Sequence, residues 1–415
     1  MFFLHWGGIY LLGILWISMC APYDKVAHAG GKIENFYVKG LNKSIPVSMI
    51  TFANYDEMEL VDLDSYNIKA DVYVAPKWSI RKFIYALTKR LRGWNPFSIK
   101  FILEPWQEFY IKRNLLRRKK NGDIPSAIII EWTQPILLTE WIKKQFPGVP
   151  IIAIEEDVSF LSYERQYLNE KKFIFRCYKQ KRYTTLKKSE LLQLGYADLV
   201  ILNNYKDYNL LLREGMSKEK MWVWTPYFQS MKDLTYIGDT KDILFYGAMG
   251  RYENYASAIW FIKNVLYKIK DTEVRLVVLG SRPHPSLQKY AGNRVIITGF
   301  VDDIRPYFQH SLCLVAPLIL GAGVKIKIIE SLTAGLPVLT NDIGIEGIPA
   351  EDGKSYYHCN KPEDYIEKIQ LLLDDRSYAQ AMSINEKNLA NEIYDYDKSL
   401  EIFVKKVSDM ACKAR

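Results

Sequence analysis

LVAPLILGAGVKIKIIESLTAGLPVLTNDIGIEG, residues 314–347, carries the clearest fold signal in the chain, because its apolar spacing changes twice and glycines stand at both changes. The leading apolar run predicts a buried strand, and Gly321 and Gly323 predict a tight turn. From Val324 onward the apolar residues recur at helical spacing, until Gly335 ends the helix before a second strand. The stretch therefore predicts strand, glycine turn, helix and strand, as in a parallel α/β sheet.

The predicted helix of this stretch has the features of an anion site. A helix that begins at a glycine turn offers N–H groups and a positive dipole end, and Lys325 and Lys327 add charge within its first turn. Glu330 is suited to accept hydrogen bonds from sugar hydroxyls, which a lysine cannot do. We therefore expect a nucleotide-sugar site. The alternative is a solvated pair of Lys327 and Glu330, with the glycines needed only for the turn.

Length and composition are those of a globular α/β protein. The chain of 415 residues is too long for one ordinary core, so we expect two α/β domains of about 200 residues each. Its five cysteines lack CxxC spacing, and its five histidines lack ligand spacing. This pattern favours neither a zinc site nor a disulfide framework, and it is typical of a reducing compartment such as the cytoplasm.

The net charge of +9 is concentrated in the first half of the chain. Residues 77–120 alternate lysines and arginines with Trp, Phe, Tyr, Ile and Leu, a composition that favours an anionic bilayer surface. Nucleic acid is a competing partner, but no RNP-like or zinc-finger motif accompanies the basic residues, so we expect no nucleic acid. The remaining alternative is two ordinary helices with a solvated basic face.

Strand-like runs alternate with helical or turn segments along the first half. Residues 12–21 predict a buried first strand, preceded by an apolar extension that also resembles a signal peptide or a membrane span. Further runs lie at residues 46–52, 71–75, 126–131, 149–155 and 197–202. This alternation predicts a mostly parallel sheet wrapped by helices.

A second glycine turn follows the first predicted strand. Gly30 and Gly31 stand between that strand and a helix that we expect to begin near Lys32, and His28 lies beside the turn. Loops at the carboxyl ends of strands are where open α/β sheets bind ligands. The alternative is a turn that binds nothing.

Three carboxylates, Glu155, Glu156 and Asp157, follow another predicted strand of the first half. Carboxylates at the end of a strand are candidates for acid–base work or for binding the hydroxyls of an acceptor. The alternative for Asp157 is a cap on the following helix.

The second half repeats the alternation after a polar segment, and we place a domain boundary between residues 228 and 229. Strands are expected at residues 243–246, 273–279, 295–298 and 312–316. The βα junctions that follow carry glycines, namely Gly247, Gly280, Gly299 and Gly321. Four such loops on one sheet edge predict a nucleotide pocket.

Several common site motifs are missing from the sequence. No GxxxxGK[ST] or GxSxG is present, which argues against a P-loop NTPase and a serine hydrolase. DxD spacing, which suits a divalent cation at a diphosphate, occurs at residues 62–64 and 395–397. Both lie away from every glycine loop, so we expect neither a metal nor a cofactor.

With these features the chain resembles the glycosyltransferase family 4 group of GT-B enzymes. The most specific matches are GFVDDIRPYF, residues 299–308, and P-x(3)-G-x-G-x-K-x-K-x-x-E-x(4)-G-x-PV, residues 317–338. APYDKVAHAGGK and FYGAMGRYEN support them. The resemblance implies two Rossmann-like domains facing each other across a cleft, a nucleotide-sugar donor on the second and a glycan or lipid-linked acceptor on the first. It also implies transfer with retention, without a metal, in bacterial surface polysaccharide synthesis.

The resemblance assigns residues to the donor. Gly30 and Gly31 match the glycine loop that approaches the donor phosphates, and Glu330 matches the glutamate at the ribose hydroxyls. The residues that match the family's diphosphate clamp are Gly323, Val324, Lys325 and Lys327. Phe300 and Val301 match the residues that line the base pocket.

Two positions depart from the family pattern. Ala322 stands where the first glutamate of the paired-glutamate motif would fall, and Glu156 stands where many relatives carry histidine. Either Glu156 takes over the role of that histidine or the donor phosphate acts as the base. Two alternatives to the transferase are an inactive GT-B-like scaffold subunit and a sugar-phosphate epimerase of the same fold.

The expected division of the chain has three parts. We expect residues 1–228 to form a basic acceptor domain with a surface suited to the inner side of the plasma membrane, and residues 229–385 to form the donor domain. Residues 386–415 are helices that we expect to pack back on the N-terminal domain.

Overall fold

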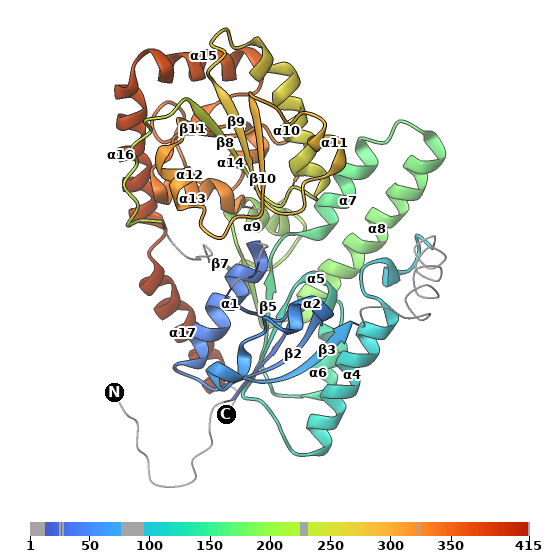
Figure 1. Ribbon diagram of the computed structural model, residues 1–415. Helices are drawn as coiled ribbons and strands as arrows, with labels where there is room; N and C mark the ends of the chain where they lie inside the picture. Colours follow the sequence, from blue (N-terminus) through green and yellow to red (C-terminus); the bar gives the residue numbers. More distant parts are fainter. Residues whose placement is uncertain are drawn as a thin grey trace. The chain divides into compact units, whose positions relative to one another are not determined.

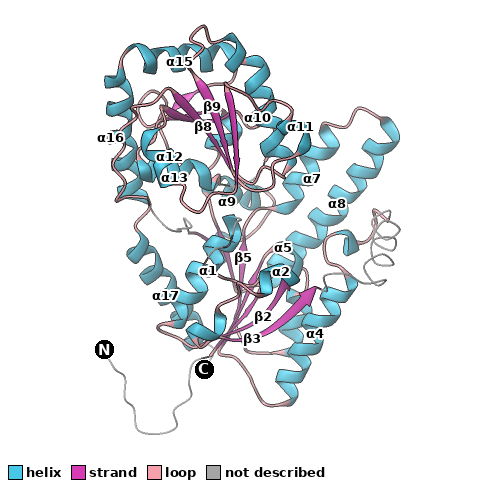
Figure 2. Cartoon of the chain, viewed as in Figure 1, coloured by secondary structure: helices cyan, strands magenta, loops and turns pink. Residues whose placement is uncertain are grey.

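The computed structural model describes residues 13–24, 26, 29–75, 95–224, 231–321 and 324–413. The chain forms two compact units (Figure 1). The first unit contains Met1–Pro226 and Asp397–Arg415, and the second contains Tyr227–Tyr396, so the predicted segment 386–415 is divided between them. Each unit is a parallel sheet covered by helices, which confirms the predicted fold class (Figure 2).

The first unit has a seven-stranded parallel sheet in the order β3-β2-β1-β4-β5-β6-β7. Its strands are β1 Ile14–Ile17, β2 Val47–Asn54, β3 Lys69–Ala75, β4 Ala127–Glu131, β5 Ile151–Glu155, β6 Leu199–Leu202 and β7 Met221–Val223. Every residue of β1, β4, β5 and β6 is buried, because apolar side chains point to both covered faces. The predicted first strand is confirmed but shortened to Ile14–Ile17, and residues 1–12 lie outside the described part.

Helices cover both faces of this sheet. They are α1 Ala29–Asn42, α2 Tyr55–Met58, α4 Pro105–Lys120, α5 Thr133–Ile136, α6 Thr139–Gln145, α7 Ser159–Leu168, α8 Phe173–Tyr196, α9 Tyr205–Arg213 and α17 Tyr396–Lys413, with 3₁₀ turns η1 Leu63–Tyr66, η2 Ile99–Phe101 and η3 Lys218–Lys220. The helix expected near Lys32 begins at Ala29 instead. Gly30 and Gly31 therefore lie in its first turn rather than in a turn that precedes it.

An aromatic cluster fastens α17 to the rest of the first unit. The ring of Phe403 stacks on Trp224 with centroids 4.4 Å apart, and it lies 5.2 Å from the ring of Tyr37 on α1. A Cβ on Gly40 would lie 2.5 Å from a side-chain carbon of Leu400, so glycine permits α1 and α17 to approach closely. The last helix thus completes the core of the unit that contains the first strand.

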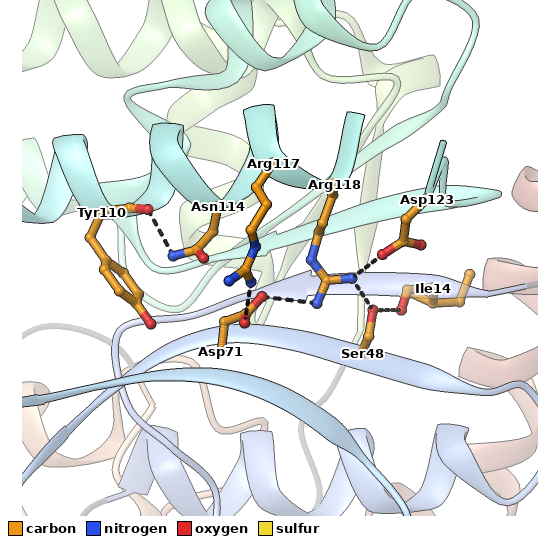
Figure 3. Close-up of polar contacts among 8 residues, drawn as sticks. All are labelled: Ile14, Ser48, Asp71, Tyr110, Asn114, Arg117, Arg118 and Asp123. Carbon is orange, nitrogen blue, oxygen red and sulfur yellow. Dashed lines mark hydrogen bonds and ion pairs between the residues drawn. The ribbon is translucent and has the colours of Figure 1, made fainter. Parts of the chain in front are cut away.

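An ion-pair network ties α4 to the amino ends of the first three strands (Figure 3). Arg118 contacts Asp71 of β3 at 3.1 Å, Asp123 at 2.8 Å and the hydroxyl of Ser48 on β2 at 3.2 Å. The neighbouring Arg117 contacts the same Asp71 at 2.5 Å. These two arginines belong to the basic run 77–120 and have a structural use here. Residues 76–94 of that run lie outside the described part.

The second unit has a six-stranded parallel sheet in the order β10-β9-β8-β11-β12-β13. Its strands are β8 Asp242–Tyr246, β9 Arg275–Leu279, β10 Val295–Gly299, β11 Cys313–Ala316, β12 Val338–Thr340 and β13 Tyr357–His358. Its helices are α10 Tyr252–Asn264, α11 Pro285–Gln288, α12 Arg305–His310, α13 Ile326–Ala334, α14 Asp342–Ile345, α15 Pro362–Asp374 and α16 Arg376–Ile393, with the turn η4 Leu266–Lys268. The predicted strands are confirmed.

Both sheets reverse their strand order once. In the first unit the chain moves outward from β1 to β3 and then returns to place β4 on the other side of β1. In the second unit the same reversal occurs between β8 and β11. Open α/β sheets bind ligands outside the carboxyl ends of the strands at such a switch point. Among the described residues, no helix has the length and apolar character needed to cross a membrane.

Candidate functional site

Glycines crowd the carboxyl edge of the second sheet beside its switch point. Gly247 follows β8 and Gly280 follows β9, with φ angles of 152° and 146°. A Cβ on Gly280 would lie 1.7 Å from the carbonyl oxygen of Gly247, so no larger residue fits there. The amide of Gly247 donates to Leu279 at 3.0 Å and that of Gly280 donates to Gly299 at 3.0 Å. The three loops are thereby fixed to one another.

The side chain of Lys327 reaches this glycine edge from α13. Its Nζ donates to Oδ1 of Asn254 at 2.8 Å, and a Cβ on Gly247 would lie 3.0 Å from the same Nζ. Burial, together with the charges of Lys325 and Arg251, lowers the pKa of Lys327 to about 7. An anion placed here would reverse these effects, because it would stabilise the ammonium form.

Asn254 is a residue that the sequence did not reveal. It is 8% exposed on α10, and its amide nitrogen donates to the carbonyl of Ala248 at 3.0 Å. The loop after β8 thus fixes the orientation of Asn254, which in turn fixes Lys327. The motif GAMGRYEN, which ends at Asn254, could have identified this residue, because a polar residue at the start of a helix after a glycine loop is well placed to line a binding site.

Lys325 occupies the N-cap position of α13, and the helix begins at Ile326 rather than at Val324. Val324 therefore lies in the preceding loop, while Gly323 and Ala322 lie outside the described residues. The Nζ of Lys325 is 4.0 Å from a carboxylate oxygen of Glu346. A Cβ on Gly321, whose φ is 150°, would lie 3.0 Å from Cε of Lys325. The two lysines are close enough for the charge of one to lower the pKa of the other.

The remaining donor-side residues lie on the same unit. Glu330 is 3% exposed in the middle of α13, so its carboxylate is buried rather than paired in solvent with Lys327. Phe300 follows β10 directly and is 70% exposed, and Val301 is half-buried beside it. An exposed ring after a glycine at the carboxyl edge provides a surface on which a base can stack.

At the switch point of the first unit, Gly30 packs against an indole ring. A Cβ on Gly30 would lie 2.3 Å from a ring carbon of Trp132, the residue that follows β4. Trp132 donates through its Nε1 to Glu34 of α1 at 3.3 Å. Gly30 therefore permits close packing of α1 on β4, while the first N–H groups of α1 remain at the carboxyl edge. His28 lies outside the described residues.

Buried carboxyl groups gather at this switch point. Glu131 ends β4 and accepts from Trp16 Nε1 at 2.8 Å, and Glu34 accepts from Cys20 Sγ at 3.0 Å. Glu156, after β5, accepts from the amide of Asn203 at 3.2 Å. Neither Glu34 nor Glu131 was predicted from the sequence. Glu131 ends a correctly predicted strand, but only the strand order places it beside Glu156.

Glu131 and Glu156 lie close enough for each carboxyl to shift the pKa of the other. Burial raises the pKa of Glu156 to about 7, with the charges of Asp157 and Glu34 adding to the shift. Burial likewise raises the pKa of Glu34 to about 7 and that of Glu131 well above its usual value. Glu156 is thus suited to accept or donate a proton near neutral pH.

The other two predicted carboxylates have different surroundings. Glu155 is 1% exposed and accepts from the hydroxyl of Thr133 at 2.6 Å, so it faces the interior. The suggestion that Asp157 caps the next helix is wrong, because Glu190 of α8 accepts from the amides of Ser159 and Phe160 at 2.8 and 3.1 Å. Asp157 is half-buried beside the carboxyl cluster, where its charge raises the pKa of Glu156.

Neither DxD motif lies in the glycine loops. Asp62 pairs with Lys39 of α1 at 2.7 Å, and Asp64 lies on η1. Asp395 and Asp397 flank the start of α17. In the described part of the chain, no group of three or more His, Cys, Asp or Glu side chains is placed to hold a metal ion.

Part of the second unit matches a known protein family. Residues 240–375 match the family model of glycosyl transferases group 1. A curated relative, an uncharacterized 44.6 kDa protein in the cps region of Klebsiella pneumoniae, is 21% identical over 226 residues, which are 50% of this chain and 58% of that protein. The chain thus matches little more than half the length of that relative.

Solved structures show the same fold at low identity. HepE of Anabaena in complex with UDP has a TM-score of 0.67 and 13% identity, covering 95% of this chain and 99% of its own. Sucrose-phosphate synthase from Thermosynechococcus elongatus has a TM-score of 0.70 and 13% identity, covering 97% and 99%. A glycosyltransferase from Rickettsia africae has a TM-score of 0.63 and 14% identity, covering 97% and 99%. The chain has the GT-B fold, and the comparisons support a glycosyltransferase.

Proposed function

We propose that the protein is a retaining glycosyltransferase of family 4 that moves a sugar from a nucleoside diphosphate to a glycan or lipid-linked acceptor. The observation that carries this proposal is Lys327, a buried lysine held by Asn254 beside Gly247 at the switch point of the second sheet. A buried lysine whose pKa is lowered to about 7 is stabilised by an anionic ligand. The first turn of α13 adds N–H groups to the same place.

The chemistry follows from the charge that builds up on the donor. When the bond between the anomeric carbon and the β-phosphate oxygen breaks, its electron pair goes to the phosphate. Lys325, Lys327 and the N–H groups of α13 would hold that negative charge. Removing one fixed donor of this kind costs about 3 kcal/mol of barrier. No metal is required in this scheme, since the two ammonium groups supply the positive charge.

The other donor contacts follow from position on the same unit. Phe300 and Val301 would line the base, Glu330 would accept from the ribose hydroxyls, and Gly280 and Gly321 would permit close approach of the donor. HepE was crystallised with UDP, and a further structure of it contains UDP-glucose, which favours a uridine nucleotide here.

The first unit would hold the acceptor. Glu156 has its pKa raised to about 7, so it would take the proton of the acceptor hydroxyl. In the alternative scheme the departing phosphate takes that proton. Gly30 and Gly31 would present N–H groups of the first turn of α1 to the donor phosphates.

The setting that we propose is bacterial surface polysaccharide synthesis at the cytoplasmic face of the plasma membrane. The match to a protein encoded in a cps region supports the pathway. The excess of positive charge supports an anionic membrane as partner.

A direct test combines a donor screen with transfer of a labelled sugar. A thermal-shift screen across UDP-, GDP-, ADP- and CMP-sugars identifies the donor, and the radiolabelled sugar is then followed into hydrolysis or an acceptor. Lys327→Ala should lower turnover at least a hundredfold, while Lys354→Ala, which removes a side chain 64% exposed, should not. Full turnover by Lys327→Ala would contradict the clamp, and no binding of any nucleotide sugar would contradict the proposed function.

A further inference from the structure

Helices α7 and α8 form a hairpin in the first unit (Figure 1). The tip of this hairpin exposes large apolar side chains. Phe173, Ile174 and Phe175 begin α8 and are 78%, 80% and 55% exposed. Leu168 ends α7 and is 54% exposed. We call these four residues the apolar tip. Soluble proteins rarely leave so many neighbouring large apolar side chains in water without a partner.

Positive charge surrounds the apolar tip. Residues 165–182 contain seven lysines or arginines, and Glu170 is their one carboxylate. Glu170 is paired with Lys179 at 2.5 Å. Lys171, Lys172 and Arg176 are exposed next to the apolar tip. Apolar side chains with flanking cations are the composition that binds an anionic bilayer surface.

The shape of the apolar tip favours a bilayer over a protein partner. Residues 171–177 are exposed without interruption, which means that the first turn of α8 is uncovered on every side. A protein interface covers one side of a helix, whereas a lipid headgroup layer surrounds a tip that enters it. From these observations we propose that the apolar tip inserts into the headgroup region of an anionic bilayer.

The hairpin extends from the same edge of the first sheet at which Glu156, the acid–base candidate, lies. Glu190 of α8 caps the start of α7, directly after the carboxyl end of β5, where Glu156 lies. Glu190 lies 17 residues after Phe173, a rise of about 25 Å along α8. The apolar tip therefore lies beyond the carboxyl edge of the first sheet. This inference rests on the proposed function where it assigns the bilayer as the source of a lipid-linked acceptor.

Vesicle cosedimentation tests the docking surface. The full chain is mixed with vesicles of phosphatidylcholine alone and with vesicles that also contain phosphatidylglycerol. We expect binding to the anionic vesicles only, and we expect F173S/I174S to lower the partition coefficient at least tenfold. The matched control is Y378S/I384S on α16, which removes side chains 46% and 61% exposed and should change the partition coefficient less than twofold.

A second measurement follows insertion rather than binding. Cys177 is exposed one turn after the apolar tip, and Cys412 is the other exposed cysteine among the described residues. An environment-sensitive dye on Cys177, in a Cys412→Ser background, should shift its emission to the blue with anionic vesicles. The same dye on Cys412, in a Cys177→Ser background, should not shift.

Three results would overturn the proposal. The first is that the full chain binds neither kind of vesicle, and the second is that F173S/I174S binds as well as the unchanged chain. The third is that Phe109→Ser, which alters a ring 65% exposed on α4, abolishes binding while F173S/I174S does not. Nucleotide-sugar binding is measured without vesicles in parallel. A chain that binds no nucleotide sugar contradicts the proposed function. A chain that binds nucleotide sugar but no vesicles contradicts only the insertion of the apolar tip into a bilayer.

Discussion

The ammonium nitrogen of Lys327 on α13 lies 2.8 Å from Oδ1 of Asn254 on α10, so one hydrogen bond joins the helices that follow the two strands of the switch point. Asn254 is itself fixed by the carbonyl of Ala248 in the loop after β8. The cation is therefore positioned before any ligand arrives. Preorganisation of this kind is what makes a fixed charge effective on a developing negative charge.

The lowered pKa of Lys327 predicts that donor affinity depends on pH. Above its pKa of about 7 the lysine is neutral, and a bound diphosphate raises that pKa, so binding takes up a proton. The association constant for UDP-glucose should therefore fall by up to about tenfold per pH unit above neutrality. Calorimetry in two buffers of different ionisation enthalpy measures both the affinity and the proton uptake.

Asn254→Asp serves as the paired variant for that experiment. A carboxylate beside Nζ raises the pKa of Lys327, so the fall in affinity should begin at higher pH than in the unchanged protein. An affinity that stays constant across the range in the unchanged protein would contradict the assignment of Lys327 to the donor.

The buried carboxyls of the first unit predict a stability that falls as pH rises. Burial raises the pKa of Glu156 in the folded state to about 7, above its usual value of 4.5. Its stabilising contribution is therefore fully present below the unfolded pKa and is lost as pH rises through about 7. Glu156→Gln should flatten the fall in the urea midpoint between mildly acidic and neutral pH. Glu363→Gln, an exposed change on α15, should leave the slope unaltered. Identical slopes in all three proteins would show that Glu156 does not titrate as inferred.

Gly30→Ala should destabilise the first unit although alanine favours helices. The added Cβ would lie 2.3 Å from the ring of Trp132, and relief of such a clash costs about 1–3 kcal/mol. Gly195→Ala on α8 is the matched control, because nothing lies within 4 Å of its Cβ and glycine disfavours helix. It should raise stability by up to about 1 kcal/mol. Chemical unfolding compares the two, and equal effects would argue against the packing of α1 on Trp132.

Arg118 and Arg117 are adjacent on α4 yet should differ in importance (Figure 3). The side chain of Arg118 is 12% exposed and contacts two carboxylates and the hydroxyl of Ser48. Arg118→Ala leaves Asp123 and Ser48 without their charged partner and leaves Asp71 with Arg117 alone, which should cost about 2–4 kcal/mol of unfolding free energy. The side chain of Arg117 is 55% exposed, so Arg117→Ala should cost less than about 1 kcal/mol. Urea unfolding measures the loss of stability in both variants. A larger loss for Arg117→Ala than for Arg118→Ala would mean that Arg118 does not hold α4 against the sheet.

The parts of this structure that sequence could predict are those fixed by local chemistry. The strands β1, β4 and β5 were recognisable because residues buried on both faces leave a continuous apolar run. Gly247 and Gly280 were recognisable because positive φ angles after strands require glycine. The helical spacing of the apolar residues after Gly321 placed Lys327 on the correct helix.

The parts that sequence could not predict depend on which strands are neighbours. Glu34, Glu131 and Glu156 are far apart along the chain, and only the order β1-β4-β5 brings their carboxyls together. The start of α1 was misplaced because Gly30 was interpreted as a turn residue, whereas its lack of a side chain serves the packing of Trp132. Tertiary packing, absent from local patterns, decided both cases.

The division of the first unit into two separated segments also governs the order in which the chain folds on the ribosome. Trp224 and Tyr37 are synthesised long before Phe403, the ring against which both pack. The second unit, Tyr227–Tyr396, is complete before that ring emerges. A nascent chain therefore carries a complete second unit while the first unit still lacks α17. A stop codon before Phe403 leaves the first unit, which is synthesised earlier, as the incomplete one.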